Sequence, residues 1–346
     1  MDVGLLFSFR NPEFNRVPWT QTYSSELDLA VAAEDLGYDH VWLSEHHFVD
    51  DGYSPSLLPI AAAIAARTTT IRIGTYVLLL PLHNPVRVAE DAATVDVISN
   101  GRFDLGMSLG YRPGEFTGMG IPSNERAARF QEALPLIQQL LAGETVSLDG
   151  RFNQIKDVKI VPPPVQKTLP IWIGARGDKA LDRAARLGCH LASIGGLGHR
   201  NKYLEALKRH GRKAADHHVG QLMVCYVADT TEQAWEDCAE PLHHTISEYQ
   251  NWAAESGDQT GDGGAEMAVP SPKEIEAAQA CEFFGRPAMI GDAKTVLEGL
   301  RAFYQETPGS HFVIIMALPG ADPARTRKSM ELFATQVMPE LKKMTN

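Results

Sequence analysis

Short apolar runs alternate with amphipathic segments along almost the whole chain. The first run, "VGLLFSF" at residues 3–9, is apolar at nearly every position, as expected for a strand buried on both faces. The segment that follows, residues 24–36, has apolar residues at helical spacing and is closed by Gly37. The alternation repeats, which predicts strands at 3–9, 40–45, 71–81, 101–110, 169–175, 189–196, 220–228 and 311–318, and helices at 24–36, 57–69, 85–99, 124–142, 178–188, 201–211, from about 231 and from about 323.

The repeated strand–helix unit predicts an α/β fold. Strands that are apolar throughout, each followed by a helix, form a parallel sheet covered by helices. Eight such units favour a closed (β/α)8 TIM barrel with insertions over an open doubly wound sheet. We therefore predict a single domain over residues 1–346. No glycine-rich dinucleotide fingerprint follows a strand, so a Rossmann domain is not supported.

Two segments interrupt the strand–helix rhythm. Residues 143–170 contain alternating residues, an Asp-Gly turn and three consecutive prolines, which predict a small β insertion before the fifth strand. Residues 254–273 are rich in glycine and acidic residues and poor in bulky side chains. Such a stretch buries too little apolar surface to order itself, so we expect a mobile loop. It is either a lid over the site or a surface loop.

Charge and cysteine content narrow the classes of partner and the compartment. The formal net charge is −11, which argues against nucleic acid or an anionic membrane as a partner. The four cysteines show no C-x-x-C spacing and no disulfide framework. The first residues form a strand at once, without a signal-peptide pattern, and no apolar stretch approaches the length of a membrane span. We therefore expect a cytoplasmic protein.

The second predicted strand ends in an unusual polar sequence, "VWLSEHHF". Glu45, His46 and His47 follow the apolar residues 41–43 and Ser44, and in a barrel this end of a strand faces the active site. Three roles are open: metal ligands, an acid/base group beside a cofactor, or polar residues that end a strand. Adjacent residues of an extended chain point to opposite faces, so both imidazoles cannot readily bind one metal. We favour a histidine that transfers protons near neutral pH, and we predict no metal site.

Three later segments suggest where a flat ligand with a phosphate can bind. The long third strand leaves room for an irregular peptide at Tyr76–Val77, although an ordinary strand fits the pattern better. Ser108 alternates with Gly106 and Gly110, a set of small residues that leaves space at the end of the fourth strand, and Tyr111 follows. "GARGDKALDRAARLG" combines Arg176 with a helix start, a combination that binds anions, although a plain capped helix explains the same letters.

The chain resembles the bacterial-luciferase-like flavin-dependent monooxygenases, which adopt a (β/α)8 barrel. The resemblance runs nearly end to end and is carried by three segments: "GYDHVWLSEHHF", "GTYVLLLPLHNPVRVAEDAATVDVISNGRFDLGMSLG" and "SMELFATQVMPELKKM". The first histidine of the family's E-H-H-F motif is its catalytic imidazole, which corresponds to His46. The family's non-proline cis peptide beneath the flavin corresponds to Tyr76–Val77.

The same resemblance implies the remaining cofactor contacts. Luciferase has an arginine where this chain has Leu109 and a hydroxyl where it has Ala180, so phosphate binding rests on Arg176 with backbone N–H groups, or on Arg200. Phe7 and Phe48 are expected to line an apolar substrate pocket. The full set of residues expected to contact the cofactor is Glu45, Tyr76, Val77, Ser108, Leu109, Tyr111, Arg176, Gly177, Asp178, Ala180 and Ser193.

The resemblance also implies an activity and its partners. Reduced FMN, supplied by a separate NAD(P)H:flavin reductase, forms a C4a-hydroperoxyflavin with O2 and transfers one oxygen atom to a small apolar organic substrate. Members of the family pair through the helices that flank the second and third strands, so we expect a homodimer. Two alternatives stay open: an F420-dependent oxidoreductase of the same superfamily, and a flavin-binding barrel without catalytic activity.

Overall fold

Eight parallel strands close into a barrel, which confirms the predicted fold class. The computed structural model describes residues 1–194, 197–256, 268–309 and 311–345. Pairing of β9 with β10, and of β14 with β1, completes the ring. In chain order the barrel strands are β1 (Asp2–Phe7), β2 (His40–Leu43), β3 (Arg72–Thr75), β5 (Phe103–Ser108), β8 (Ile171–Gly174), β9 (His190–Ser193), β10 (Val219–Val227) and β14 (His311–Ile315).

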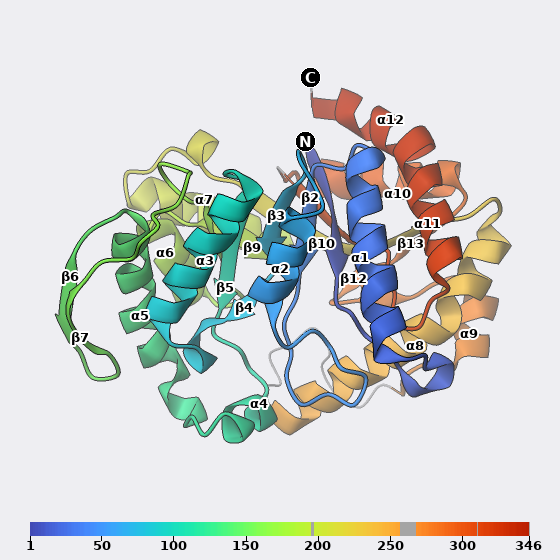
Figure 1. Cartoon of the computed structure of the whole chain (residues 1–346). Helices are drawn as coiled ribbons and strands as arrows, with labels where there is room; N and C mark the ends of the chain where they lie inside the picture. The colour runs from blue at the N-terminus through green and yellow to red at the C-terminus, as the bar shows by residue number, and fades with distance from the viewer. Residues whose placement is uncertain (195–196, 257–267, 310, 346) are drawn as a thin grey trace.

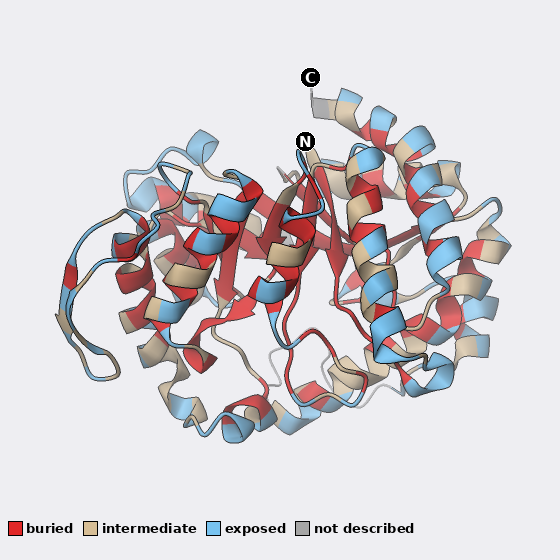
Figure 2. Ribbon diagram, in the orientation of Figure 1, coloured by how far each residue is buried: buried red, intermediate tan, exposed pale blue. Residues whose placement is uncertain are grey.

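Helices surround the barrel and cover the outward-facing side chains of the strands, with their own outer faces exposed (Figure 2). Within the described residues, none of them has the length and apolar character that crossing a membrane requires. The helices are α1 (Trp19–Asp35), α2 (Leu57–Ala65), α3 (Pro85–Ser99), α4 (Pro113–Gly118), α5 (Arg126–Leu141), α6 (Asp178–Arg186), α7 (Leu197–Arg209), α8 (Thr231–Ser256), α9 (Pro272–Ala278), α10 (Ala293–Glu306), α11 (Pro323–Leu332) and α12 (Met338–Lys342).

Local sequence signals set several helix starts. The side chain of Asn84 accepts hydrogen bonds from the backbone N–H groups of Val86 and Arg87, and Pro85 occupies the first helical position of α3. Asp322 caps α11 in the same way. Helix α1 begins at Trp19, earlier than the predicted residue 24. The hydrophobic pattern missed this start because the first turn, which is mostly polar, carries no helical hydrophobic spacing.

The two irregular segments behave differently. Within 143–170, strands β6 (Val146–Asp149) and β7 (Gln154–Val158) form an antiparallel pair that projects from the side of the barrel (Figure 1). Within 254–273, α8 continues to Ser256 and a capping box at Ser271 starts α9. Residues 257–267 lie outside the described residues, so the loop expected there stays a prediction.

The stretch between α8 and β14 holds elements that the hydrophobic pattern did not predict. After α9 the chain forms the short antiparallel pair β11 (Glu282–Phe283) and β12 (Arg286–Pro287). It then adds β13 (Met289–Gly291) beside β10, and α10, which is capped by Asp292. The predicted third strand is also interrupted, since β3 ends at Thr75 and β4 (Leu78–Leu79) resumes after it.

Large aromatic side chains fill the centre of the barrel against glycines on neighbouring strands. Trp42 packs edge-on against Trp172 and Tyr76, with ring centroids 5.3 and 5.6 Å apart. A Cβ atom added to Gly74 would lie 2.2 Å from the Trp42 ring, and one added to Gly4 would lie 2.7 Å from it. The glycines therefore make room for the tryptophan, which closes the middle of the barrel.

We predict that Gly74→Ala lowers the free energy of unfolding by about 1–3 kcal/mol, because the new methyl group overpacks the Trp42 ring. Urea denaturation of the purified protein measures the change. Gly198→Ala is the matched control, since a Cβ there meets nothing within 4 Å and alanine favours the helix. Equal free energies of unfolding for Gly74→Ala and the parent would show that the space around the Trp42 ring accommodates an additional methyl group.

Candidate active site

At the carboxyl ends of the barrel strands, several residues remain partly exposed to solvent. Below this layer, Trp42, Trp172 and Val313 are buried and close the barrel. Above them, the side chains become apolar or small and remain partly exposed to solvent, although they lie at the centre of the molecule. This upper layer consists of Val77, Ser108, Gly174, Ile194 and Ile315.

Val77, Ser108 and Gly174 lie against one another in this layer. A Cβ atom on Gly174 would be 3.1 Å from the Cβ of Ser108 and 3.3 Å from a methyl group of Val77. The peptide bond between Tyr76 and Val77 is cis, as the family resemblance implies. The hydroxyl of Tyr76 donates to the carbonyl oxygen of Ser193, 2.9 Å away, which fixes the ring below Val77.

His46 is held at the rim of the barrel by a buried carboxylate. Its Nδ1 lies 2.8 Å from Oε1 of Glu115, which is fully buried on α4. The same oxygen accepts the backbone N–H of His47 at 3.0 Å. Because a carboxylate only accepts hydrogen bonds, Nδ1 carries the proton and Nε2 is the free basic nitrogen. This orientation gives His46 one nitrogen for proton exchange.

The neighbouring His47 points the other way and belongs to a second buried cluster. Its Nε2 donates to Oε1 of Glu45 over 2.6 Å, and Nε2 of His83 donates to the same oxygen over 2.7 Å. The other carboxylate oxygen accepts the backbone N–H of Leu79 at 2.8 Å. Burial acts to raise the pKa of Glu45, but the hydrogen bonds from His47 and His83 outweigh it and lower the pKa to about 2.

In this cluster the carboxylate of Glu45, predicted as a cofactor contact, bonds to protein groups. Its carboxylate is saturated by protein donors and ties the end of β2 to β4. The three groups of Glu45, His47 and His83 also lie close enough to hold a metal ion. His83 comes from the loop after the third strand, so two imidazoles meet here although adjacent histidines diverge.

Four aromatic rings surround the imidazole of His46. Tyr53 and Trp252 approach most closely, with ring centroids 4.7 and 4.6 Å away, and Tyr111 and Tyr249 lie at 5.9 Å. The hydroxyl of Tyr53 is 2.8 Å from Ser44 and 3.0 Å from the hydroxyl of Tyr249. An apolar shell of this kind excludes water from the basic nitrogen.

The end of α8 supplies two of these rings and is anchored by Arg112. The guanidinium donates to the carbonyl oxygen of His47 over 2.8 Å and lies 4.8 Å above the ring of Trp252. Its Nε is 3.5 Å from a carboxylate oxygen of Glu255. Figure 1 shows α8 running across this end of the barrel toward α4. Arg112 therefore links the covering helix to the E-H-H-F segment.

A basic region lies beside this apolar shell. Arg176 is half-buried after β8, next to Phe284, and its positive charge acts to lower the pKa of Tyr111, although burial, the largest effect, keeps that pKa raised. Gly177 caps α6, so the first N–H groups of this helix face outward from the same point. Asp178 is paired with Lys202 at 2.8 Å, which offsets its charge. Ala180 follows in the first turn of α6, and its side chain has no hydroxyl group to donate to a phosphate.

Four of the expected site residues lie elsewhere. Phe7 and Ser193 alternate with the inward-facing residues of their strands, and Phe7 packs in the outer core beneath the helices. The side chains of Phe7 and Ser193 therefore lie on the opposite faces of their strands from Leu6 and Ala192, and their expected ligand contacts stay predictions. Leu109 packs against the same outer core. Phe48 is 60% exposed at the surface and packs on Gly118.

The partners of His46 were the main omission of the sequence analysis. Glu115 lies on the short helix α4 and Arg112 lies just before it, where no periodic pattern marks either residue. Tyr249 and Trp252 lie on α8, a helix far along the chain. The one available signal was "RPGEF", in which a proline at the first helical position precedes an acidic residue in the first turn.

Comparison with known proteins identifies the family. The family described as luciferase-like monooxygenase matches residues 1–311. This chain belongs to that family. The oxygenase component of the flavin-dependent trigonelline monooxygenase of Acinetobacter baylyi is 26% identical over 334 residues, which are 92% of this chain and 90% of that protein. The predicted enzyme class is thus confirmed at the level of the family.

Other luciferase-like relatives differ in cofactor. An F420-dependent glucose-6-phosphate dehydrogenase of Microbacterium testaceum is 40% identical over 167 residues, 46% of this chain and 49% of that protein. The oxygenating constituent of 3,6-diketocamphane monooxygenase of Pseudomonas putida, solved with FMN, superposes with a TM-score of 0.78 and 20% identity over 98% of each chain. Across the first curated relatives, the match spans 49% to 90% of their length.

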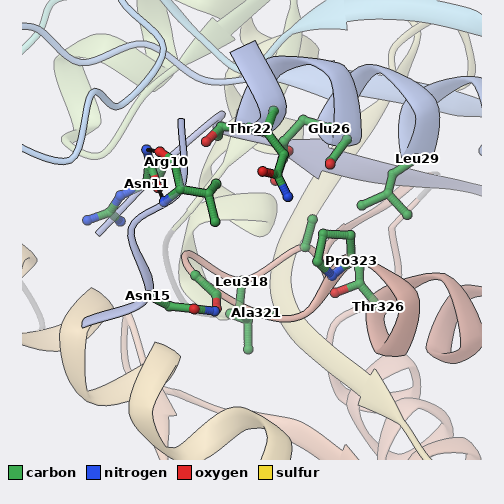
Figure 3. A pocket seen from close by; sticks show the side chains of 15 residues that line it. Arg10, Asn11, Asn15, Thr22, Glu26, Leu29, Leu318, Ala321, Pro323 and Thr326 are labelled. Atoms are coloured by element: carbon green, nitrogen blue, oxygen red, sulfur yellow. Dashed lines mark hydrogen bonds between the residues drawn. The ribbon is translucent and has the colours of Figure 1, made fainter. Parts of the chain in front are cut away.

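A separate pocket of about 80 Å³ opens between α1 and the loop that follows β14 (Figure 3). Thr22 and Glu26 project into it from α1, and Leu318 and Ala321 line the opposite side. Within the described parts of the chain, Oε2 of Glu26 and Oγ1 of Thr22 have no hydrogen-bond partner. Burial raises the pKa of Glu26 to about 8, although the backbone N–H of Phe9 bonds to its carboxyl group and opposes the shift.

We predict that Glu26→Gln stabilises the protein increasingly as pH rises from about 4.5 to about 8. In that interval the folded protein keeps a proton that the unfolded chain loses, so the parent's stability falls with rising pH. Glutamine has no proton to lose, so the advantage of the variant grows by at most about 1.4 kcal/mol per pH unit.

Urea denaturation at several pH values measures this difference. Glu205→Gln, at an exposed position on α7, is the matched control and is expected to follow the parent. A constant difference between Glu26→Gln and the parent across the interval would mean that Glu26 is ionised in the folded protein.

Proposed function

We propose that this chain is the oxygenase component of a two-component, FMN-dependent monooxygenase that transfers one oxygen atom of O2 to a small apolar organic substrate. The observation that carries the proposal is the Glu115–His46 pair beside the apolar upper layer of the barrel. It provides an oriented proton-transfer group next to a surface that fits a flat, largely apolar ring system. Membership of the luciferase-like family supports the same reading.

The residues of the barrel mouth fit a flavin. Val77, Ser108 and Gly174 offer a surface of small side chains over which a planar ring can lie. Arg176 and the first N–H groups of α6, which follow Gly177, are the groups that would hold the phosphate. Reduced FMN, when bound, supplies the electrons that activate O2, so that one oxygen atom enters the substrate and the other leaves as water.

The protein's own contribution is proton transfer and water exclusion. Glu115 holds Nδ1 of His46, so Nε2 accepts or donates a proton at the reacting atoms. Trp252 and Tyr249 cover the imidazole, which keeps water away from a reduced and oxygen-reactive cofactor. Arg112 fixes this cover through its contacts with Trp252 and the His47 carbonyl.

The proposal includes partners and a location. The described residues form one barrel without a separate nicotinamide-binding domain. We propose that reduced FMN comes from a separate NAD(P)H:flavin reductase, as the trigonelline relative's description as an oxygenase component suggests. We also propose a homodimer through α2 and α3, because Val97 and Ile98 of α3 are 40% and 45% exposed. The four free thiols are in keeping with a cytoplasmic protein.

The alternative function is an F420-dependent oxidoreductase that transfers a hydride. The 40% identity to an F420-dependent dehydrogenase over 167 residues favours it. The same barrel mouth and the same oriented imidazole serve either reaction, so the choice depends on the cofactor. The near-complete alignment with a flavin-dependent monooxygenase favours FMN.

We predict that FMN binds more tightly than F420. Titration of the protein into each cofactor, followed by quenching of cofactor fluorescence, compares the two dissociation constants directly. Reduced FMN is titrated under anaerobic conditions as the third ligand. Tighter binding of F420 would replace the monooxygenase proposal with the hydride-transfer alternative.

We predict that His46→Ala loses at least about 100-fold in oxygen-dependent turnover, since an oriented general acid/base contributes that much, while its FMN dissociation constant changes little. Substrate-dependent oxygen consumption with reduced FMN and a flavin reductase measures turnover. His210→Ala, at an exposed histidine just after α7, is the matched control.

Glu115→Gln separates proton transfer from simple loss of structure. The amide keeps the size of the side chain but removes the charge that faces Nδ1 of His46. We therefore expect partial activity with a displaced pH profile, and a smaller loss of turnover than the loss predicted for His46→Ala. Unchanged turnover in His46→Ala would exclude the acid/base role of the imidazole.

A further inference from the structure

The amino-terminal end of the barrel carries a second group of imidazoles, far from His46 along the strands. Asp2, His40 and His311 occupy the first positions of β1, β2 and β14. Asp2 and His311 are register partners on adjacent strands, and Gly4 is the register partner of His40. This is the end of the barrel at which the chain begins in Figure 1.

Strand alternation turns these three side chains into the barrel. Leu6, Trp42 and Val313 face the interior, and Asp2, His40 and His311 are offset from them by an even number of residues on the same strands. Gly4 makes room for His40, because a Cβ atom there would lie 2.8 Å from the Cβ of His40. The three side chains therefore converge below Trp42.

The polar atoms of this group are spaced for a shared ion. Nε2 of His311 is 3.1 Å from a carboxylate oxygen of Asp2, and one ligand atom from each residue lies within 4.8 Å of the others. Bonds of about 2.1 Å in a tetrahedral metal site place ligand atoms roughly 3.4 Å apart. The existing separations therefore need only small side-chain adjustments.

One imidazole nitrogen in this group is left without a partner. His40 is 97% buried, and its Nδ1 has no hydrogen-bond partner among the residues that the structure describes. The nearest carboxylate of β5, Asp104, is 3.8 Å from Nε2 of His40, beyond hydrogen-bond distance. A buried imidazole nitrogen without a partner is costly, and a bound cation would satisfy it.

The protonation states suit metal binding. Burial lowers the pKa of His40 well below its usual range, and the nearby His311 adds to this effect. The hydrogen bond to His311 lowers the pKa of Asp2 to about 2. A neutral imidazole and an ionised carboxylate are the forms that bind metal ions.

We propose that Asp2, His40 and His311 form a site for one divalent transition-metal ion of the Zn²⁺ type. Two imidazoles and one carboxylate favour Zn²⁺, Co²⁺ or Ni²⁺ over Mg²⁺ and Ca²⁺, which prefer oxygen ligands. The side chain of Asp2 is 47% exposed, so an ion can enter from solvent. A bound ion joins the first, second and last strands of the ring.

The cluster of Glu45, His47 and His83 is the competing site. There, the Glu45 carboxylate already accepts three hydrogen bonds, two of them from the imidazoles themselves. A metal would have to displace those protons. At the amino-terminal end a metal would displace one such hydrogen bond, between His311 and Asp2, while Nδ1 of His40 is unpartnered among the described residues before any ion binds.

The test uses the full chain with no affinity tag, after treatment with a chelator. Titration with Co²⁺ is followed by visible ligand-field absorption and by calorimetry. We expect one ion per chain. We also expect Asp2→Asn and His311→Gln to weaken binding by more than about tenfold, since each removes a ligand.

His83→Gln and His210→Gln are the controls, and both are expected to bind Co²⁺ like the parent. Zn²⁺ should raise the thermal unfolding midpoint of the parent but not that of Asp2→Asn, whose half-exposed position makes misfolding a poor explanation. Absence of stoichiometric binding overturns the proposal. So does binding that is lost in His83→Gln and retained in Asp2→Asn.

Discussion

The hydrogen bond between His46 and Glu115 is the interaction on which the rest of the site depends. It selects which imidazole nitrogen carries the proton and leaves the other nitrogen without the carboxylate. The same carboxylate oxygen holds the backbone of His47, so one buried charge sets both the position and the chemistry of the E-H-H-F segment. Arg112 donates to the backbone carbonyl oxygen of His47.

The fold follows from simple patterns, and most of it was predictable. Runs of apolar residues such as 3–9 and 311–318 marked the barrel strands because parallel strands are buried on both faces. Helix α10 was missed because irregular short strands precede it, which hid its start at Asp292. The break between β3 and β4 was visible only as excess length of one apolar run.

The site was harder to predict than the fold. The position of His46 follows from its place at the end of a strand, but its partner Glu115 lies on another element. It is brought near by the pairing of β2 with β3 and of β3 with β5. Glu45 was predicted as a cofactor contact, and the structure gives its carboxylate three hydrogen bonds from its protein neighbours, which the local sequence did not indicate. The course of α8 over the barrel mouth decides which side chains there remain exposed to solvent. No local sequence pattern predicts that course.

The seam between β1 and β14 carries a consequence for synthesis of the chain. The ring has no closed form until its last strand exists, since Asp2 pairs with His311 and Leu5 with Ile314. Until β14 is made, the other seven barrel strands of a nascent chain can form only an open sheet, whose two edge strands lack pairing partners. Such long-range closure is slow, which makes the exposed edges of β1 and β10 the natural points for chaperone protection or misassembly.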